Sequence, residues 1–562
     1  MTASQSSFQR YSWFLLFIAG MGGLLYGIDV GIIAAALLYL SKTIDLTVQQ
    51  TSFIVAAVLG GSMFGSLIAG ILADLFGRKK LMIVSGLMFV VSVVIIVLSQ
   101  GFVSLFLGRL LQGMSGGVIA VVVPLYLAEC LGPENRGRGT AIFQFMLTFG
   151  IVCAALIGWF YTHQAEGAIA AAGANVALIH AAQNHAWRGM FLSVIYPGLI
   201  FFLGAFALSE SPRWLLLHGH AAEALAALRR STGEEEARRE FEEMQAVARE
   251  SSQKKISSPA GSLLRRKYVV PFVLACVIMT CNQTTGINSI LGFLVIILKQ
   301  AGMTASRATQ GDVAVIVLNC VMTLVGVALV DKKGRTFLLR IGTGGIVIAL
   351  ALAGVVFVRS ESGRVDVKGK VEAAVSGNSL SLPVNATTFS VPSLGGGPMS
   401  LTVLYSYGHG ERMATVLSNE PNPILTIAPE TADSHALLHV DRAFFGPVPT
   451  ERTGWLVTAC LALFISCYAL GPGVVVWLAL SELMPTRIRS VGMGISLVLN
   501  QGASTLIAAV FLPVVGNYGY ATMFFFWSAC TIIYFITAAF FLPETKGKTL
   551  EEIEMHFADA RS

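Results

Sequence analysis

Two side chains of opposite charge stand inside long apolar stretches of this 562-residue sequence. Asp29 is the one acidic residue that we place well inside such a stretch, and Arg109 is the one basic residue. A charge inside a bilayer is costly and therefore needs a partner. If Asp29 and Arg109 pair in only one conformation, the proton affinity of the carboxyl changes with conformation, which is the requirement for proton coupling. A permanent structural ion pair is the alternative.

Six uncharged amides and one indole also lie within apolar stretches. They are Gln144, Asn282, Gln283, Asn288, Asn319, Asn500 and Trp477. An amide both donates and accepts hydrogen bonds, and an indole offers a flat apolar face. Together these groups are suited to bind a neutral ligand that is covered with hydroxyl groups. Taken singly, each amide could instead join two helices by a hydrogen bond.

Acids and bases form a third group, at the ends of apolar stretches. They are Asp74, Arg78, Glu129, Arg136, Glu210, Arg335, Glu482 and Arg489. Exposed ion pairs contribute little singly, but a network of them can bias an equilibrium between two conformations. A set of solvated loops that only orients the chain in the membrane is the alternative. That alternative explains the bases but leaves the acids beside them unexplained.

The composition indicates a protein that is embedded in a lipid bilayer. Hydrophobic residues make up 55% of the chain and charged residues 12%, against about 25% charged in a soluble domain. The mean hydropathy is +0.71. These values exclude a soluble enzyme, a disordered chain and a nucleic-acid-binding protein. The cysteine spacing indicates no metal site, and no nucleophile–base pair stands out, so we expect neither enzyme activity nor a cofactor.

Twelve apolar runs are long enough to cross a bilayer, which takes about 20 residues per helix. The runs are approximately 11–40, 52–73, 81–99, 103–128, 140–161, 189–208, 268–298, 311–330, 337–358, 455–480, 491–512 and 521–542. Backbone groups inside a bilayer find no water to bind, so each run should form a helix. The expected fold class is an all-α membrane protein.

Two short charge motifs occur twice along the chain. Asp74 and Arg78 follow the second run, as Asp331 and Arg335 follow the eighth. A Glu–Arg pair likewise follows both the fourth and the tenth run. Parallel repeats of this kind are typical of one large transporter architecture. The repeat therefore predicts two halves of six transmembrane helices each.

The spacing of the motifs predicts how the halves are delimited. The first half should occupy residues 1–208 and the second residues 268–562, with a charged helical cytoplasmic linker at 209–267. The motifs are spaced more widely in the second half, which places an insert at 359–452, between the ninth and tenth runs. By the same comparison, the first half carries extra residues in its Ala- and His-rich stretch, 162–187.

The insert alternates between apolar and polar residues in two stretches, which begin at Arg364 and Met399. Alternation with a period of two indicates β-strands. We therefore expect a small β-rich module outside the membrane, with a disordered loop as the alternative.

Lysine and arginine predict the orientation of the chain. Most of them lie on one side of the membrane if the N-terminus is cytoplasmic, including those of the linker. Because positive residues favour the cytoplasmic side, both termini should be cytoplasmic and the insert should face outward. We expect a multi-pass protein of the cell membrane, either a plasma membrane or a bacterial inner membrane.

Glycines within the runs have two expected roles. Gly286 and the segment Gly471–Gly473 favour local breaks in the seventh and tenth runs, where a helix can bend as a gate. Gly61, Gly65 and Gly70 in the second run are expected to be positions of close helix packing.

Eight motifs in this order resemble those of the sugar porter family of the major facilitator superfamily, with the bacterial proton-coupled monosaccharide symporters as the nearest type. They are the groups Asp74, Gly77, Arg78 and Lys79; Gly108 and Arg109; Pro124, Tyr126 and Glu129; Glu210 and Arg213; Asn282, Gln283, Gly286 and Asn288; Asp331, Gly334 and Arg335; Gly471, Gly473, Trp477, Glu482, Pro485 and Arg489; and Pro543, Glu544 and Gly547. The resemblance covers nearly the whole chain apart from the insert and part of 162–187.

The resemblance assigns functions to the three residue groups. It implies that the amides and Trp477 bind a monosaccharide, either a hexose or a pentose. It implies that Asp29 stands where proton-linked members carry an aspartate and passive facilitators an asparagine. It further implies that the charged group ties the two halves together while the cavity faces outward. The expected activity is therefore sugar:proton symport by alternating access, carried out by a monomer.

Other functions remain open at this point. The chain could be a passive sugar facilitator, or it could carry a polyol, a cyclitol or an organic acid on the same fold. An organic-acid carrier should have a basic residue without a partner in its cavity, whereas Arg109 has Asp29. A sugar sensor that does not transport is a further alternative.

Overall fold

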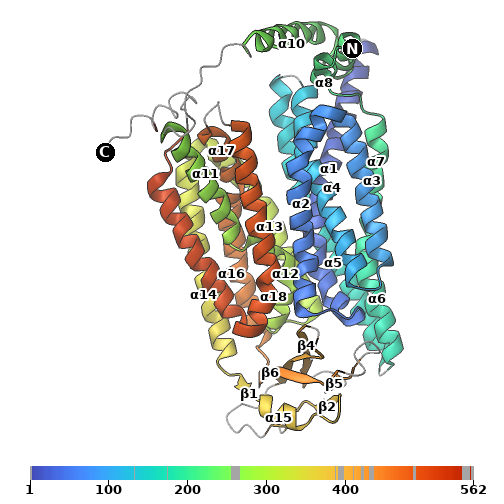
Figure 1. Ribbon diagram of the computed structural model, residues 1–562, viewed down its shortest axis with the longest axis vertical. Helices are drawn as coiled ribbons and strands as arrows, with labels where there is room; N and C mark the ends of the chain where they lie inside the picture. Colours follow the sequence, from blue (N-terminus) through green and yellow to red (C-terminus); the bar gives the residue numbers. More distant parts are fainter. Residues whose placement is uncertain are drawn as a thin grey trace.

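The computed structural model describes most of the 562-residue chain. Residues outside the description are 1–2, 132, 174, 255–265, 386–387, 390–397, 409, 419–422, 430–435, 485–488, 547–556 and 558–562. Within the described residues, twelve helices are long and apolar enough to cross a membrane, as the sequence predicts. The chain is mostly helical, and its helices stand side by side in two bundles (Figure 1).

The first bundle contains the blue to teal helices of Figure 1. They are α1 (Ala3–Thr43), α2 (Val48–Phe76), α3 (Arg78–Leu98), α4 (Phe102–Cys130), α5 (Pro133–Ala172), α6 (Val176–Ser193) and α7 (Ile195–Phe206). Helix α1 packs chiefly against α5, and α2 against α4. Most of the stretch 162–187 is helical. It contains the end of α5 and the beginning of α6, with a turn at Gly173 between them.

The second bundle contains the green to red helices. They are α11 (Arg266–Thr284), α12 (Ile287–Gln300), α13 (Ala305–Lys333), α14 (Arg335–Glu361), α16 (Glu451–Leu470), α17 (Pro472–Leu483), α18 (Arg489–Ile536) and the π-helical end η1 (Thr537–Phe541). Helix α18 holds two membrane spans, which are separated at Gly519, where φ is 84°. The bundles meet where α2 packs against α18 and α5 against α13.

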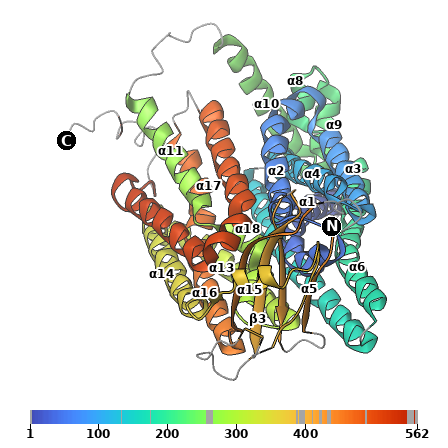
Figure 2. The same ribbon diagram turned by 60° about the horizontal axis from the view of Figure 1, so that its bottom comes forward.

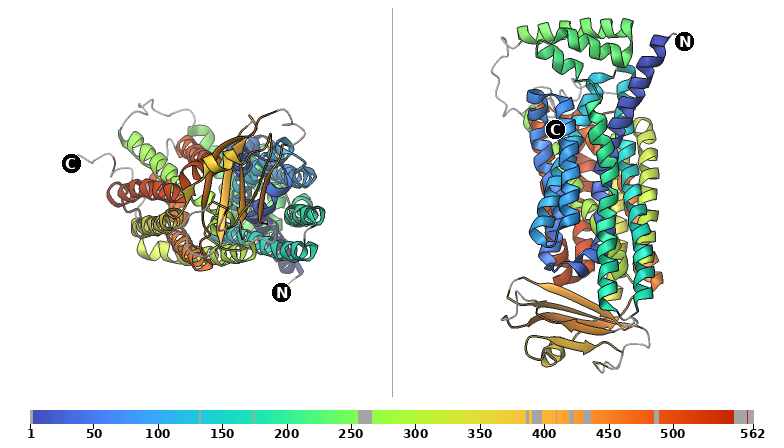
Figure 3. Two further views of the ribbon diagram at one scale, coloured as in Figure 1. Left: turned by 90° about the horizontal axis from the view of Figure 1, so that it is seen from below. Right: turned by 90° about the vertical axis from the view of Figure 1, so that its right-hand side faces the viewer.

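Two smaller structures lie at opposite ends of the bundles (Figure 3). One contains α8 (Pro212–Leu217), α9 (Ala221–Thr232) and α10 (Glu234–Lys254), and we call this side the linker end. The Arg230 guanidinium lies 4.2 Å from the centre of the Tyr11 ring and so attaches α9 to the start of α1. The other structure is the insert between α14 and α16, and we call that side the insert end.

The insert contains two small antiparallel sheets, which lie across the ends of the helices (Figure 2). A four-stranded sheet has the order β1-β6-β3-β4, and a two-stranded sheet pairs β2 with β5. The strands are β1 (Val365–Asp366), β2 (Leu380–Pro383), β3 (Met399–Ser406), β4 (Arg412–Leu417), β5 (Ile424–Ile427) and β6 (His439–Pro447). The predicted β-rich module is therefore confirmed.

The prediction of a strand is mostly wrong for one of the two alternating stretches of the insert. The stretch from Met399 forms β3, but the stretch from Arg364 forms only the two-residue β1 before the short helix α15 (Lys368–Ala373). The side chain of Asp366 accepts a hydrogen bond from the backbone N–H of Lys368, at 2.9 Å. This local bond satisfies a donor at the start of α15, which alternation alone does not reveal.

Large apolar side chains cover the flanks of the bundles. Phe64, Ile71 and Phe540 are 53%, 66% and 78% exposed, which is unusual for residues of this type in a soluble protein. In a membrane protein this surface contacts lipid, so its exposure is expected.

Glycines let α2 approach α4 at van der Waals distance. A β-carbon on Gly61 would lie 2.2 Å from the carbonyl oxygen of Leu110, and one on Gly65 would lie 2.2 Å from that of Met114. Both positions are packing glycines, as predicted. Gly70 has no atom within 4 Å of such a β-carbon, so the packing role predicted for it is wrong in this conformation.

The substitutions Gly61→Ala and Gly70→Ala should have opposite effects on stability, although both add one methyl group to α2. We expect Gly61→Ala to lower the melting temperature of the purified protein, since overpacking costs about 1–3 kcal/mol. Gly70→Ala should leave the melting temperature unchanged or raise it, because alanine favours a helix by roughly 0.5–1 kcal/mol over glycine. Thermal unfolding in detergent measures both, and equal effects would contradict the close approach of α2 to α4.

Candidate functional site

The buried ion pair that the sequence predicts is present. Arg109 on α4 lies with its Nη1 atom 3.1 Å from Oδ1 of Asp29 on α1. The same Nη1 atom donates to the side-chain oxygen of Gln112 at 2.6 Å. Asp29 is 0% exposed and Arg109 1% exposed. The guanidinium carbon of Arg109 also lies 5.4 Å from the centre of the Phe191 ring.

This pair is not fully satisfied by hydrogen bonds. Oδ2 of Asp29, Nε of Arg109 and Nε2 of Gln112 are buried and have no hydrogen-bond partner among the described residues. A buried polar atom without a partner is destabilising by about 1–3 kcal/mol. A β-carbon on Gly116 would lie 3.4 Å from Oδ2 of Asp29, so the glycine keeps the space beside this oxygen open. The second carboxylate oxygen is therefore able to accept a proton or a new donor.

Three of the predicted amides form one hydrogen-bonded cluster in the second bundle. Asn288 on α12 donates to the Gln283 side-chain oxygen at 2.9 Å and to Ser504 Oγ at 2.8 Å. Gln283 on α11 donates in turn to Oδ1 of Asn500 on α18, at 3.2 Å. Asn500 donates to the backbone carbonyl of Met279, at 2.8 Å. The cluster joins α11, α12 and α18, and Ser504 is a member that the sequence did not identify.

A break in the seventh run positions this cluster. Helix α11 ends at Thr284 and α12 begins at Ile287, as the sequence predicts. Gly286 has φ 81°, and a β-carbon there would lie 2.3 Å from the indole of Trp527. Both the left-handed backbone and the contact with the indole require glycine at this position. The turn at Gly286 thus lies between the two amides of Gln283 and Asn288.

Asn282 has a partner of its own. Its Nδ2 atom donates to the hydroxyl of Tyr468 on α16 at 3.3 Å, while its buried Oδ1 atom has no partner among the described residues. Tyr468 comes shortly before Gly471, where α16 ends and α17 begins, so the tenth run is broken as predicted. Tyr468 is not among the residues predicted from the sequence, although its position beside a predicted break was a usable signal.

Among the described residues, no hydrogen bond joins the side chain of Gln144 or Asn319 to the amide cluster. They belong to α5 and α13, which pack against each other where the two bundles meet. The hydroxyl of Thr148 on α5 accepts from the thiol of Cys320 on α13, at 3.6 Å. These two amides are therefore carried by helices at the bundle interface. The side chain of Trp477 lies outside the described residues.

The structure reveals a second buried acid within a membrane span. Asp312, near the start of α13, is 3% exposed and forms no ion pair with a described residue. The prediction that Asp29 is the only acid well inside an apolar run is therefore wrong. Asp312 falls close to the predicted beginning of its run, where a carboxyl group usually reaches water. In the folded chain, neighbouring helices cover it instead.

The charged group at the linker end forms a compact cluster in the first bundle. Nη2 of Arg78 lies 2.9 Å from Oδ1 of Asp74, and Nε lies 2.8 Å from Oε2 of Glu129. Glu210 accepts hydrogen bonds from the backbone N–H groups of Arg78 and Lys79, at 2.8 and 3.0 Å. Its carboxylate thus caps the beginning of α3, where donors have no partner within the helix.

The second bundle repeats this cap. Glu544 accepts from the backbone N–H groups of Arg335 and Thr336 at the beginning of α14, at 3.0 and 3.1 Å. A glycine precedes the capped helix in both bundles, Gly77 with φ 95° and Gly334 with φ 91°. A β-carbon on either glycine would lie within 2.6 Å of the capping carboxylate. The Gly–Arg motif therefore makes room for an acid as well as placing a base.

Four of the predicted site residues have side chains outside the description. Three belong to the charged group, and one is the indole of the predicted sugar site. They are Arg136, Trp477, Glu482 and Arg489. The two ion pairs of Arg78 lie within the first bundle. A network that links the two bundles stays a prediction.

Burial raises the pKa of the Glu544 carboxyl, because it disfavours the charged form. Hydrogen bonds from Lys546, Arg335 and Thr336 favour the charged form and outweigh burial. The pKa of this carboxyl therefore falls below its ordinary value of 4.5. A carboxyl whose pKa is lowered by folding stabilises the protein above its unfolded pKa, and this contribution is lost as the pH falls through the folded pKa. We therefore expect Glu544→Gln to lower the melting temperature at pH 7 and to weaken its dependence on acid pH. Thermal unfolding at a series of pH values below 7 measures both effects.

The control for this experiment is Glu223→Gln, which changes an exposed acid of α9. It should retain the melting temperature and the acid dependence of the unchanged protein. If Glu544→Gln behaves in the same way as this control, the carboxylate does not stabilise the beginning of α14.

Comparison with known proteins agrees with this architecture. The family model described as "Sugar (and other) transporter" matches residues 15–377 and 438–557. The glucose transporter GlcP of Staphylococcus epidermidis is 27% identical over 547 residues, which are 96% of this chain and 96% of that protein. The proton myo-inositol cotransporter of Homo sapiens is 26% identical over 96% of this chain and 81% of its own length.

A solved structure has the same fold. The xylose transporter XylE from E. coli, in a partially occluded inward open conformation, superposes with a TM-score of 0.67. The match covers 96% of this chain and 100% of that chain, at 19% sequence identity. The family model leaves residues 378–437 of the insert unmatched, so most of the insert is an addition to the common architecture.

Proposed function

The chain belongs to the sugar (and other) transporter family, and on this premise we propose that it carries a monosaccharide across the cell membrane by alternating access, together with a proton. One observation carries the proposal. A cluster of neutral amides at the broken helix α11–α12 lies in one bundle, and a buried acid–base pair lies in the other.

The amide cluster supports a neutral, hydroxylated substrate. Gln283, Asn288 and Asn500 supply donors and acceptors without a net charge, and Ser504 adds a hydroxyl. Oδ1 of Asn282 is an acceptor without a partner among the described residues, so it is ready to bind a substrate hydroxyl. We assign Gln144, Asn319 and the indole of Trp477 to the same site on the family resemblance.

The Asp29–Arg109 pair supports coupling to protons. Arginine keeps its charge in proteins, so a change of protonation in this pair takes place on Asp29. Motion of α1 against α4 that lengthens the contact of 3.1 Å would favour the protonated carboxyl. Conformation and proton binding are then linked, which is the physical basis of symport.

The two bundles are the parts that move. Breaks at Gly286 and Gly471 allow short helix segments to bend near the amide cluster. At the linker end, we propose that Arg136, Glu482 and Arg489 complete a network with the cluster around Arg78. This network holds the bundles together in the outward-facing state and breaks when the cavity opens inward.

The orientation follows from the basic residues. We propose that the linker end faces the cytoplasm, so that both termini are cytoplasmic and the insert faces outward. The protein functions as a monomer, since each chain carries both bundles and a complete set of candidate site residues.

A cyclitol is the second candidate substrate, because a relative that matches 96% of this chain is a proton myo-inositol cotransporter. Its ring carries hydroxyl groups and no net charge, so the same amides suit it. An organic acid is less compatible, since Arg109 already pairs with Asp29.

Asp29→Asn should abolish the accumulation of a labelled monosaccharide driven by a pH gradient, because an amide cannot take up and release the coupled proton. Exchange of labelled for unlabelled sugar across the membrane should continue. Proteoliposomes with an imposed pH gradient measure both activities, and Glu223→Gln on exposed α9 provides the control.

Three outcomes would overturn parts of this proposal. Equal accumulation with and without the gradient in the unchanged protein would make it a passive facilitator. Persistent gradient-driven accumulation in Asp29→Asn would remove this residue from coupling. Uptake of a cyclitol but of no monosaccharide in a competition panel would reassign the substrate.

A further inference from the structure

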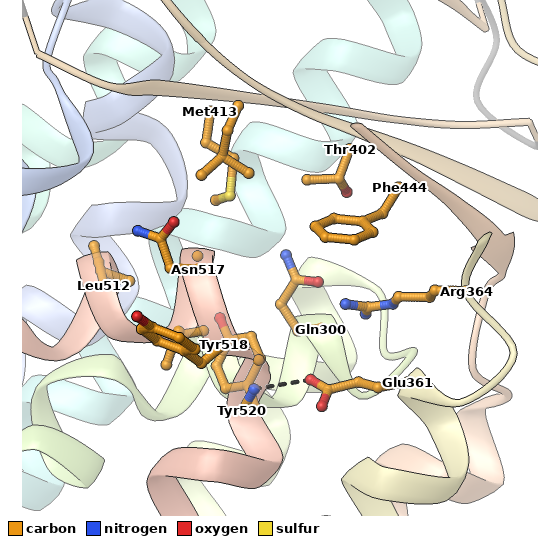
Figure 4. A pocket seen from close by; sticks show the side chains of 14 residues that line it. Gln300, Glu361, Arg364, Thr402, Met413, Phe444, Leu512, Asn517, Tyr518 and Tyr520 are labelled. Atoms are coloured by element: carbon orange, nitrogen blue, oxygen red, sulfur yellow. Dashed lines mark hydrogen bonds between the residues drawn. The ribbon is translucent and has the colours of Figure 1, made fainter. Parts of the chain in front are cut away.

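A cavity of about 240 Å³ lies between the insert and the ends of the second bundle (Figure 4). Its floor comes from the region of α18 around Gly519, and its side from Gln300 at the end of α12. Its roof comes from the sheet of the insert, where Thr402 on β3 pairs with Phe444 on β6. Neighbouring residues of these strands face the core of the insert, so alternation directs Thr402 and Phe444 toward the cavity.

The groups that line this cavity combine flat rings with neutral and charged hydrogen-bonding groups. Figure 4 shows Phe444 above Gln300, with the guanidinium of Arg364 beside them. Arg364 interacts electrostatically with the carboxylate of Glu361, which lines the same cavity. Asn517 supplies a second amide and Tyr518 a second ring, which is 68% exposed. This set of groups suits a hydroxylated ring, because the hydroxyls need donors and acceptors and the C–H face needs an apolar ring.

Hydrogen bonds between the elements that line the cavity hold its floor in place. The carboxylate of Glu361 accepts hydrogen bonds from the backbone N–H groups of Tyr520 and Ala521, at 2.8 and 3.4 Å. This contact fixes the end of α14 against the break in α18. The volume lies slightly below the roughly 300 Å³ at which small-molecule sites begin, which favours one small ring.

We propose that this cavity binds a single hydroxylated ring, a monosaccharide or a cyclitol, on the outward side of the protein. The proposal rests on the proposed function, and it adds a loading site that is separate from the amide cluster. Because its roof belongs to the insert, this site is specific to chains that carry such a module.

Direct binding to the purified full-length protein tests the proposal. Isothermal titration with a panel of monosaccharides and myo-inositol should show two sites for the transported ring. Phe444→Ala combined with Gln300→Ala should weaken one site by about tenfold or more, since it removes a ring face and an amide. Gln283→Ala combined with Asn288→Ala should weaken only the other site. Leu437→Ala, which changes a side chain of the insert that is 78% exposed, is the control.

Each outcome has a separate meaning. Unchanged binding in the Phe444→Ala, Gln300→Ala protein and in a second variant, Arg364→Gln, would overturn the outer site while the central site stands. Loss of all binding only in the Phe444→Ala, Gln300→Ala protein would overturn the central site instead. If no ring in the panel binds to the unchanged protein, both proposals fail. Melting temperatures show whether each variant is folded.

The insert also contacts the first bundle, and this is a separate observation. Arg412 at the start of β4 lies with Nη2 at 2.6 Å from Oδ2 of Asp45, in the segment between α1 and α2. The backbone N–H of Val48 donates to the carbonyl of Glu411, at 2.9 Å. The insert is covalently part of the second bundle, so these contacts join the two bundles at the insert end.

We infer that the insert is an outer latch that must release Asp45 before the cavity can open outward. Alternating access requires the outward ends of the two bundles to separate, and these contacts span that separation. The inference rests on the proposed mechanism. A β-carbon on Gly410 would lie 3.4 Å from the β-carbon of Thr47, close to the mean of about 3.8 Å in disulfides. A disulfide between Thr47→Cys and Gly410→Cys therefore locks the latch.

Oxidation of the double-cysteine protein should reduce uptake in proteoliposomes by tenfold or more, and reduction should restore it. The two single-cysteine proteins are the controls, because they share the backbone strain at Gly410 and the lost hydroxyl of Thr47. Full uptake in protein shown by mass spectrometry to carry the disulfide would overturn the latch.

A second readout does not depend on sugar transport. An additional Asn288→Cys should react at position 288 with a membrane-impermeant thiol reagent added from outside only when the latch disulfide is reduced. Mass spectrometry of the labelled peptides separates position 288 from positions 47 and 410, whose thiols are also free after reduction. Equal labelling in both redox states would overturn the latch, even if the protein moves no sugar. Absence of uptake in the unchanged protein, which retains Asn288, together with latch-dependent labelling of the variant would overturn the substrate proposal alone.

Discussion

The fold depends on satisfying backbone donors wherever a helix begins near a break or a sharp turn. In the part of the chain that the structure describes, the same solution occurs three times. A glycine with φ between 84° and 95° precedes the helix, and a glutamate from a distant segment accepts hydrogen bonds from the first N–H groups. The pairs are Gly77 with Glu210, Gly334 with Glu544, and Gly519 with Glu361. In each pair the glycine gives the carboxylate room, and the carboxylate compensates the positive end of the helix dipole. Each cap ties together helices that are far apart in sequence.

Some polar groups deeper in the spans are satisfied only in part, and these groups are among the candidates for function. Asp29 uses one carboxylate oxygen for Arg109, and Asn282 uses its amide nitrogen for Tyr468. The remaining buried oxygens of both residues have no partner among the described residues. By contrast, the three caps are closed contacts that hold helices in place. A protein that must change conformation while binding a substrate needs both kinds of contact, because closed contacts preserve each bundle and open ones can change partners.

The sequence predicts what depends on local patterns. Twelve runs, the broken helix at Gly286 and the pairing of Asp29 with Arg109 follow from hydropathy, glycine position and the cost of buried charge. The participation of Ser504 and Tyr468 does not follow, because it depends on which faces of α18 and α16 meet α11 and α12. Asp312 was missed for the same reason, since its burial comes from neighbouring helices. The role of Glu210 as a cap of backbone donors was also not visible, because a repeated acid beside a repeated arginine suggests only an ion pair.

The order of strands in the insert has a consequence for how the protein behaves among its own copies. A sheet outside a membrane offers unpaired backbone groups along its two edge strands, and such edges promote aggregation between molecules. One edge here, β1, is only two residues long. The other edge, β4, begins with Arg412 and is anchored beside Glu411 to the helical bundle. The four-stranded sheet is therefore protected at both margins, so neighbouring copies in a crowded membrane are hindered from pairing through these edges.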